Sequence, residues 1–281
     1  MRLALGLSYR GSAYRGWQSQ PDGQTVQDRV EAALSRFADR PVRTVCAGRT
    51  DTGVHALNQV VHADVDVERE PFSWVRGSNR YLPDDIAVQW CTPIDERFHA
   101  RNSARGRRYA YVLLEAPVRP AIEAGAVGWV FRPLDGDAMR AAAAVLIGEH
   151  DFSAFRSAEC QAASPVKTLR ALTIERRGVY WRFDFEASAF LHHMVRNLMG
   201  ALITIGSGNQ PAAYMTQLLA ERNRELAPPT FPPAGLYFVG PQYDQHLGIP
   251  RRTAAHDWLP RVPVELVHPD DPRPLITAPR P

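Results

Sequence analysis

The order of strand and helix patterns along the chain constrains its fold most strongly, because the same order occurs twice. In the first half, residues Val26 to Phe37 place apolar side chains at helical spacing, and Thr25 before them is a typical helix N-cap. In the second half, residues 179–187 alternate between apolar and polar side chains, as in a strand with one buried face. We expect strands at 2–8, 42–47, 58–65, 86–91, 107–115, 168–176, 179–187 and 235–240, and helices at 26–37, 71–80, 135–147 and 190–205.

Each half therefore reads strand, helix, strand, strand, helix, strand, which is the order of the ferredoxin-like βαββαβ unit. Two such units contribute eight strands. If they join edge to edge, two edges that would otherwise be open are buried. We expect an α+β fold, in which two tandem ferredoxin-like units form one continuous mixed eight-stranded sheet with its helices on one face.

The expected domain boundaries follow from this repeat. Residues 1–104 form the N-terminal half and residues 105–247 form the C-terminal half. Residues 248–281 differ from both halves, because they hold eight of the 23 prolines and show neither the helical nor the strand spacing of apolar residues. We interpret this segment as a proline-rich tail without a catalytic role.

Cysteine usage and hydropathy exclude several classes of protein. The three cysteines, Cys46, Cys91 and Cys160, are widely spaced and form no CxxC pair, so neither a disulfide framework nor a zinc site is expected. A reducing cytoplasm fits this usage best. No apolar run approaches the roughly 18 residues of a membrane span, so no membrane association is expected.

The basic residues are almost all arginine. Lys167 is the only lysine among 33 basic residues, and the formal net charge is +3. Codon bias in a GC-rich genome explains this usage most simply, but guanidinium groups also suit bidentate contact with phosphate. Five arginines lie close together next to two tyrosines, which makes nucleic-acid binding an alternative to a solvated face. They are Arg97, Arg101, Arg105, Arg107 and Arg108.

The stretch GRTDTG, residues 48–53, lies between two expected strands and contains charged and polar side chains that a turn does not require. It is a polar loop, half of an aspartic protease dyad, or the site of a single reactive carboxylate. The dyad needs two carboxylates that share a proton, and the triplet DTG occurs once. In the third interpretation Asp51 is a nucleophile or base, Arg49 favours its ionised form, and His55 assists or is merely structural.

The strand RRYAYVL, residues 107–113, places Tyr109 and Tyr111 on one face and Ala110 on the other. We expect the Ala110 face to pack against a helix and the tyrosine face to line a cleft opposite. The tyrosines are then either an aromatic core stripe or a platform on which an exposed base stacks.

The segment AFLHHMVRN, residues 189–197, is expected to begin a helix. On a helix His192 and Arg196 lie one turn apart, on a polar face that is either solvated or in contact with phosphate. Because adjacent helical side chains point in different directions, we do not expect His192 and His193 to bind one metal ion.

Five segments in this order resemble the TruA-type tRNA pseudouridine synthases, over about residues 3 to 243. Two departures concern Arg10, where the family usually has an acidic residue, and Asn102, where an aromatic residue is common. The segments are YRGSAYRGWQSQPDGQTVQDRVEAAL, CAGRTDTGVHALNQVVHAD, FHARNSARGRRYAYVL, FLHHMVRNLMGAL and GLYFV.

The resemblance implies an activity and a setting. Family members isomerise uridines at positions 38 to 40 of the tRNA anticodon stem-loop to pseudouridine, without a cofactor or catalytic metal. They are homodimers, and we expect a cytoplasmic enzyme. Their two pseudo-symmetric halves share a sheet, for which we expect an RNA-binding cleft on the face opposite the helices. A non-catalytic RNA-binding module on the same fold is the alternative.

The resemblance also implies roles for individual residues. Asp51 corresponds to the nucleophile, Arg49 to the arginine that pairs with it, and Tyr109 to the tyrosine that stacks on the target base. Leu236 corresponds to a leucine that closes the pocket. We further expect Arg196 and His55 to contact the substrate, with Arg196 and the arginines of residues 97–108 holding phosphates.

Overall fold

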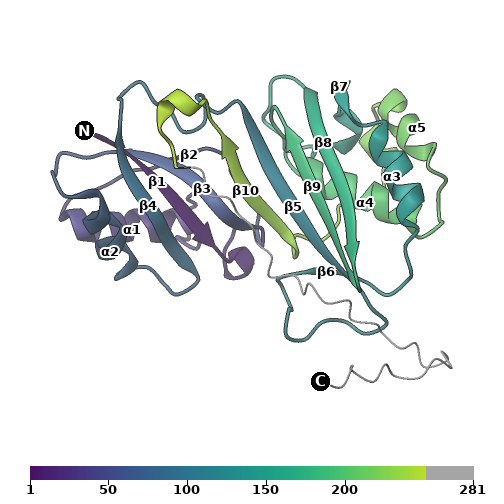
Figure 1. Ribbon diagram of the computed structural model, residues 1–281, viewed down its shortest axis with the longest axis horizontal. Coiled ribbons are helices and arrows are strands. Elements are labelled where there is room, and N and C mark those ends of the chain that lie inside the picture. Colours follow the sequence, from purple (N-terminus) through teal and green to yellow (C-terminus); the bar gives the residue numbers. More distant parts are fainter. Residues whose placement is uncertain (251–281) are drawn as a thin grey trace, which may run out of the picture.

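The computed structural model describes residues 1–250, which form ten strands and five α-helices (Figure 1). The strands are β1 (Arg2–Tyr9), β2 (Val45–Cys46), β3 (His55–Asp64), β4 (Ile86–Ile94), β5 (Gly106–Glu115), β6 (Gly128–Val130), β7 (Gly148–Asp151), β8 (Val166–Arg177), β9 (Tyr180–Ala187) and β10 (Leu236–Gln242). The helices are α1 (Val26–Ala38), α2 (Pro71–Asn79), α3 (Gly136–Ala144), α4 (Met194–Gly206) and α5 (Tyr214–Glu221). All but the first three residues of the predicted tail lie outside the described residues.

All ten strands belong to one mixed sheet, as predicted. Eight of them form an unbroken path in the order β4-β1-β3-β10-β5-β9-β8-β7, while β2 pairs with β3 and β6 pairs with β5. Strand β10 joins the halves, because it runs parallel to β3 and antiparallel to β5. The prediction of one continuous mixed sheet is therefore confirmed, with ten strands rather than eight.

The strand expected at 42–47 is shorter than predicted, and β7 takes its place in the path of eight. The backbone N–H groups of Val42 and Thr44 donate to the Ser35 hydroxyl and the Glu31 carboxylate on α1, rather than to a neighbouring strand. Only Val45 and Cys46 remain to pair with β3. Strand β7 has the sequence GEHD, which contains no apolar alternation that sequence patterns can detect.

Helix α1 begins where the sequence predicts. The Thr25 hydroxyl accepts a hydrogen bond from the Asp28 backbone N–H, and the Asp28 carboxylate accepts one from the Thr25 backbone N–H. This reciprocal pair is a capping box, which satisfies two backbone donors at the start of the helix. Among residues 1–250, no helix has the length and apolar run that a bilayer crossing requires.

The helices of both halves cover the same face of the sheet. Across the strands, Leu5 lies opposite Val61, and both belong to the core under α1 and α2. Farther along the sheet, Phe238 lies opposite Tyr109, which lies opposite Phe185 in the core under α3, α4 and α5. Because directly opposite residues share a face, these five positions mark one helix-covered side.

The expectation that the tyrosines face away from the helices is therefore wrong. Tyr111 is fully buried in the core that α3, α4 and α5 cover, and Tyr109 packs between that core and the one under α1 and α2. The small Ala110 lies on the other side of the sheet. Sequence alternation separates the two faces of a strand, but it does not say which face meets the helices.

The two groups of helices gather at opposite ends of the sheet, with β10 and β5 between them (Figure 1). Each group covers its own hydrophobic core. The middle strands of the helix-covered side can therefore hold side chains that both halves contribute. The candidate site lies there.

Candidate active site

The loop that carries Asp51 connects β2 to β3, and buried hydrogen bonds to Thr50 fix its position. The Thr50 hydroxyl is 2.7 Å from the Tyr9 hydroxyl in a buried hydrogen bond, and the Thr50 carbonyl accepts from the Trp17 backbone N–H at 3.0 Å. Gly16, with φ of 81°, passes so close that a Cβ there would lie 2.7 Å from the Thr50 carbonyl oxygen. These contacts fix the backbone on which Asp51 stands.

The Asp51 carboxylate meets three basic side chains from the other half of the chain. His192 Nε2 lies 3.3 Å from Oδ1, and His193 Nε2 lies 3.4 Å from Oδ2. The Arg196 guanidinium donates to Oδ2 at 3.2 Å. The side chain of Asp51 is only 22% exposed, so the carboxylate is enclosed by basic groups rather than dissolved in bulk water.

The expected pairing of Arg49 with Asp51 is wrong. The Arg49 guanidinium is oriented toward the Gln161 side chain, with 3.5 Å between Nη1 and Oε1, at an exposed position. Arg196 is the arginine that pairs with Asp51, and it also donates to the Phe231 carbonyl at 2.8 Å. Both contacts lie inside the site, and the expected contact of Arg196 with substrate or phosphate stays a prediction.

Both histidines reach the carboxylate because they precede α4 rather than lie within it. The helix begins at Met194, four residues later than predicted. His193, the N-cap residue, has φ of 63° and therefore adopts the left-handed conformation, which side chains other than glycine rarely occupy. Adjacent side chains diverge on a helix, but in this turn both imidazoles point to the same carboxylate.

The surrounding charges keep Asp51 ionised. Burial alone raises its pKa, but the hydrogen bond from His192 and the charges of His193 and Arg196 outweigh burial and hold the pKa below its ordinary value. The same hydrogen bond to Asp51 raises the pKa of His192, whereas burial lowers the pKa of His193. At neutral pH the site therefore presents a carboxylate that is anionic, oriented and partly shielded from water.

Tyr109 lies close enough to Asp51 for the carboxylate charge to affect its phenol. Burial raises the pKa of Tyr109, and the negative charge of Asp51 raises it further, so the hydroxyl stays protonated at neutral pH. The ring lies between Phe190 and Phe238, with both centroid distances at 5.0 Å. The structure thus brings together the predicted aspartate and tyrosine from different halves.

His55 does not belong to this group, and its expected contact with substrate is wrong. The residue is 2% exposed. Its Nδ1 accepts from the Gly11 backbone N–H at 3.1 Å, so the proton lies on Nε2, which is 2.8 Å from the Gly125 carbonyl oxygen. Its ring also stacks on Tyr237 with centroids 4.6 Å apart. His55 therefore has a structural role, because it links Gly11, Gly125 and Tyr237.

Leu236 stands on β10 directly opposite Tyr111 and is 4% exposed. It belongs to the same core as Val54, three residues after Asp51. Its expected role in closing the pocket stays a prediction.

The five arginines of residues 97–108 do not act as one patch. Arg107 is partly buried and donates to the Ala47 and Arg101 backbone carbonyls, at 3.1 and 2.7 Å. Arg97 and Arg105 form exposed ion pairs with Asp95 and Asp244, respectively. Arg101 and Arg108 are exposed. Phosphate contact by this segment stays a prediction for its exposed members.

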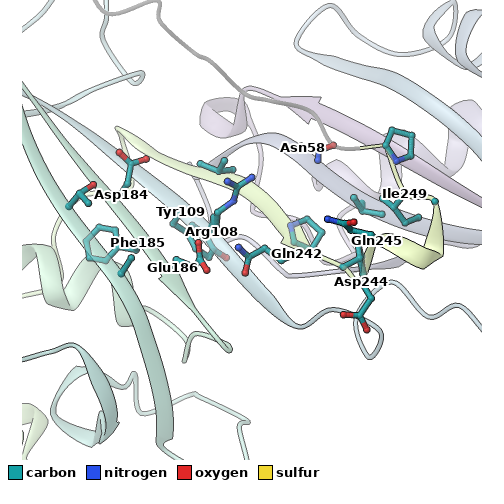
Figure 2. Close-up of a pocket in the computed structure, with 18 of the residues that line it drawn as sticks. Asn58, Arg108, Tyr109, Asp184, Phe185, Glu186, Gln242, Asp244, Gln245 and Ile249 are labelled. Atoms are coloured by element: carbon teal, nitrogen blue, oxygen red, sulfur yellow. The ribbon is translucent and has the colours of Figure 1, made fainter.

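A hollow of about 1030 Å³ has Tyr109 among its lining residues, and Figure 2 shows the side chains around it. Its lining includes Arg108, Asp184 and Glu186, which are sequence neighbours of the helix-facing Tyr109 and Phe185 and so lie mainly on the opposite face. Asp51 is not among its lining residues. Asp51 lies on the helix-covered side, and the expected RNA-binding cleft on the opposite face stays a prediction.

Comparisons with known proteins agree on one family. The family described as "tRNA pseudouridine synthase" matches residues 7–102 and 142–244. A protein of Methylibium petroleiphilum named tRNA pseudouridine synthase A is 76% identical over 260 residues, which cover 92% of this chain and 100% of that protein. A protein of the same name from Paracidovorax citrulli is 62% identical over 278 residues, with the same coverage of both chains.

A solved structure of a Cbf5-Nop10-Gar1 complex is similar over 72% of this chain and 45% of that chain, with 11% identity and a TM-score of 0.34. This likeness is too remote to add to the assignment. The family match spans both halves, and the relatives are covered along their whole length. The chain belongs to the tRNA pseudouridine synthase family, whose members are isomerases.

Proposed function

We propose that this chain isomerises uridine to pseudouridine in tRNA, at positions 38 to 40 of the anticodon stem-loop, with Asp51 as the nucleophile. The observation that carries the proposal is the enclosed Asp51 carboxylate, which three basic groups hold near the Tyr109 ring. The names of the relatives support tRNA as the substrate. The positions within tRNA come from the family resemblance.

The reaction breaks the bond from N1 of uracil to C1′ of the ribose and forms a bond from C5 to C1′. The proton on C5 leaves and N1 gains one, so the reaction is an isomerisation without redox change. Asp51 attacks either the uracil ring or the sugar carbon. In either case an ionised and oriented carboxylate is required, and the basic groups around Asp51 supply both conditions.

A uridine inside a stacked stem-loop must swing out before it can reach Asp51. The aromatic ring of Tyr109 offers a face on which the displaced base stacks, and such stacking contributes roughly 1–3 kcal/mol. Phe190 and Phe238 hold this ring in place from the α4 side and from β10. Base flipping onto Tyr109 is therefore part of the proposal.

The proposed enzyme is a cytoplasmic homodimer. The family resemblance supports the dimer, and the domain boundaries at residues 104 and 247 belong to the same proposal. The three cysteines are free thiols, which is typical of proteins in a reducing compartment.

Release of tritium from tRNA that carries [5-³H]uridine tests this function, because only replacement of the C5 proton liberates the label. Mapping of pseudouridine in the product tRNA then tests the positions. We expect release with pseudouridine at positions 38 to 40. A protein that binds tRNA tightly and releases no tritium would be an RNA-binding module, and release confined to other positions would contradict the assigned region.

A further inference from the structure

Three side chains that can bind metal ions converge in the candidate site. One ligand atom from each of Asp51, His192 and His193 lies within 4.8 Å of the other two. The two imidazole rings are 4.0 Å apart between centroids. Two imidazoles and one carboxylate form the ligand set of several three-ligand zinc sites, in which a water or substrate oxygen takes the fourth position.

The separations between the ligand atoms come close to the dimensions of such a site. Zinc binds imidazole nitrogen and carboxylate oxygen at about 2.0–2.2 Å, so two ligands at tetrahedral positions are about 3.3–3.5 Å apart. The distance from Asp51 Oδ1 to His192 Nε2 is 3.3 Å, and that from Asp51 Oδ2 to His193 Nε2 is 3.4 Å. The two distances end on different carboxylate oxygens, so the side chains must shift until one oxygen lies at this distance from both imidazole nitrogens.

The backbone conformation at His193 directs the two imidazoles toward Asp51. His193 holds a left-handed conformation, with φ of 63° and ψ of 0°. Such conformations carry strain in residues other than glycine, and they persist where the surrounding structure enforces them. The flanking contacts do so here, because the Ser157 N–H donates to the His192 carbonyl and the Asn197 N–H donates to the His193 carbonyl.

We propose that Asp51, His192 and His193 bind a divalent transition-metal ion such as Zn²⁺, and that the bound ion inhibits the enzyme by covering its nucleophile. The inhibition rests on the proposed function, whereas the binding does not. The ion is an inhibitor rather than a cofactor, so a metal-free reaction is compatible with this site. Imidazole ligands favour zinc and similar ions over Mg²⁺ and Ca²⁺, which prefer oxygen.

Arg196 limits the affinity of the site. Its guanidinium already pairs with Asp51 Oδ2 at 3.2 Å, and its positive charge repels a cation bound nearby. We therefore expect dissociation constants in the micromolar range rather than the much tighter values of structural zinc sites.

Cobalt provides a direct test, because tetrahedral Co²⁺ absorbs visible light and takes the same ligands as Zn²⁺. Co²⁺ is titrated into the full chain without tRNA, and the absorption is then competed away with Zn²⁺. We expect one equivalent of the visible-absorbing species. An absence of this species, or binding of Mg²⁺ that competes equally well, would overturn the proposal.

Three single substitutions locate the site. Asparagine tolerates the left-handed conformation better than most residues, so His193→Asn preserves the turn while it removes the imidazole. We expect His193→Asn and His192→Asn each to weaken Co²⁺ binding at least tenfold, with unchanged circular dichroism. The exposed His246→Asn is the matched control and should bind as wild type does. Unchanged binding in both site variants would overturn the assignment.

Zn²⁺ is then added to the tritium-release assay. We expect inhibition that is reversed by EDTA and overcome by excess tRNA, at the Zn²⁺ concentrations that fill the site. Full activity with the site occupied would overturn the inhibitory role. If Co²⁺ binds as described and no tritium is released under any condition, the proposed function fails while the metal site stands, so the two outcomes are distinguishable.

Discussion

At the scale of single residues, the function proposed for this site depends on how the Asp51 carboxylate is held. Asp51 meets Arg196 and His193 at one oxygen and His192 at the other. These contacts stabilise the anion against the effect of burial, and they fix the plane of the carboxylate. A nucleophile held in this way does not need to be deprotonated at the moment of attack.

Replacement of Arg196 by glutamine should raise the pKa of Asp51, because burial remains and one stabilising charge is lost. The acid limb of the turnover rate, which reports protonation of Asp51, should then move to higher pH. Arg49→Gln is the matched control, since Arg49 bonds to Gln161 and not to Asp51. Measured pH–rate profiles should show the shift for Arg196→Gln only, and the opposite pattern would restore the pairing of Arg49.

Tyr109 is expected to act through its ring more than through its hydroxyl. The raised pKa keeps the phenol protonated at neutral pH, so the hydroxyl is a poor acceptor for the C5 proton. Tyr109→Phe should retain tRNA binding and most stacking, whereas Tyr109→Ala should lower kcat/KM by roughly 10- to 100-fold more, as the loss of a stacking contact implies. Equal losses in the two variants, measured by tritium release, would assign the role to the hydroxyl.

Sequence patterns made Asp51 and Tyr109 candidates and the family resemblance assigned their roles, but neither indicated the basic partners of Asp51. Arg49 is two residues from Asp51 in the chain, yet it points elsewhere. Arg196 is 145 residues away and is the partner. Proximity in sequence favours a contact only when the loop geometry allows it. The directions of His192 and His193 depend on the left-handed turn at His193, which no pattern of apolar residues reveals.

At the scale of elements, the loop that carries Asp51 is positioned by the end of β1 and by the segment that follows it. The Tyr9 hydroxyl and the Trp17 N–H bind the side chain and the carbonyl of Thr50. Gly16 permits this close approach, because its left-handed backbone carries no Cβ to meet the Thr50 carbonyl. The loop and this segment are therefore packed directly against each other.

Gly16→Ala should displace the loop and lower turnover while the overall fold persists. The new Cβ would lie 2.7 Å from the Thr50 oxygen, at a φ of +81° that alanine also disfavours. Gly23→Ala is the matched control, because Gly23 has a φ of +65° and open space around its Cβ position. Both should lower the unfolding free energy by about 1 kcal/mol or more. Only Gly16→Ala should also reduce kcat, and an equal reduction in the control would contradict this role.

The helices and strands were predicted well where interactions between residues close in the sequence determine them. The N-cap at Thr25 and the alternating burial along β9 depend on neighbouring residues only, and both were confirmed. Strand β2 was overestimated, because the Glu31 side chain on α1 takes the backbone donor of Thr44. Strand β7 was missed, because its polar residues pair with β8 without an apolar alternation.

At the scale of the whole molecule, the two halves form one sheet and also share several polar connections. His55 is one of them, because it binds Gly11 of the first half and Gly125 of the second. The repeated order of elements predicted the shared sheet. It did not predict these contacts, because they depend on the paths of loops, which no regular spacing of apolar residues indicates.

Stability should fall with acid because of His55. Burial lowers its pKa to about 4, from an ordinary value of 6.5. The unfolded chain therefore takes up a proton as the pH falls through 6.5, while the folded chain resists protonation until about pH 4. The contribution of His55 is present above pH 6.5 and is lost between 6.5 and 4, and it amounts to about 3 kcal/mol.

Urea unfolding at a series of pH values checks this prediction. His55→Gln should be less stable than wild type at pH 7.5 and should lose less stability on acidification. The exposed His246→Gln is the control, and its pH dependence should match that of wild type. Parallel pH curves for wild type and His55→Gln would contradict the assignment.

The central claim, that the Asp51 carboxylate attacks a uridine of tRNA, is tested most directly by Asp51→Asn. The amide keeps the size and shape of the side chain but lacks the nucleophilic charge. Tritium release from [5-³H]uridine tRNA and tRNA affinity are measured on the same protein. We predict affinity within a few-fold of wild type and release reduced at least about 1,000-fold. Release at a rate near that of wild type would contradict the claim.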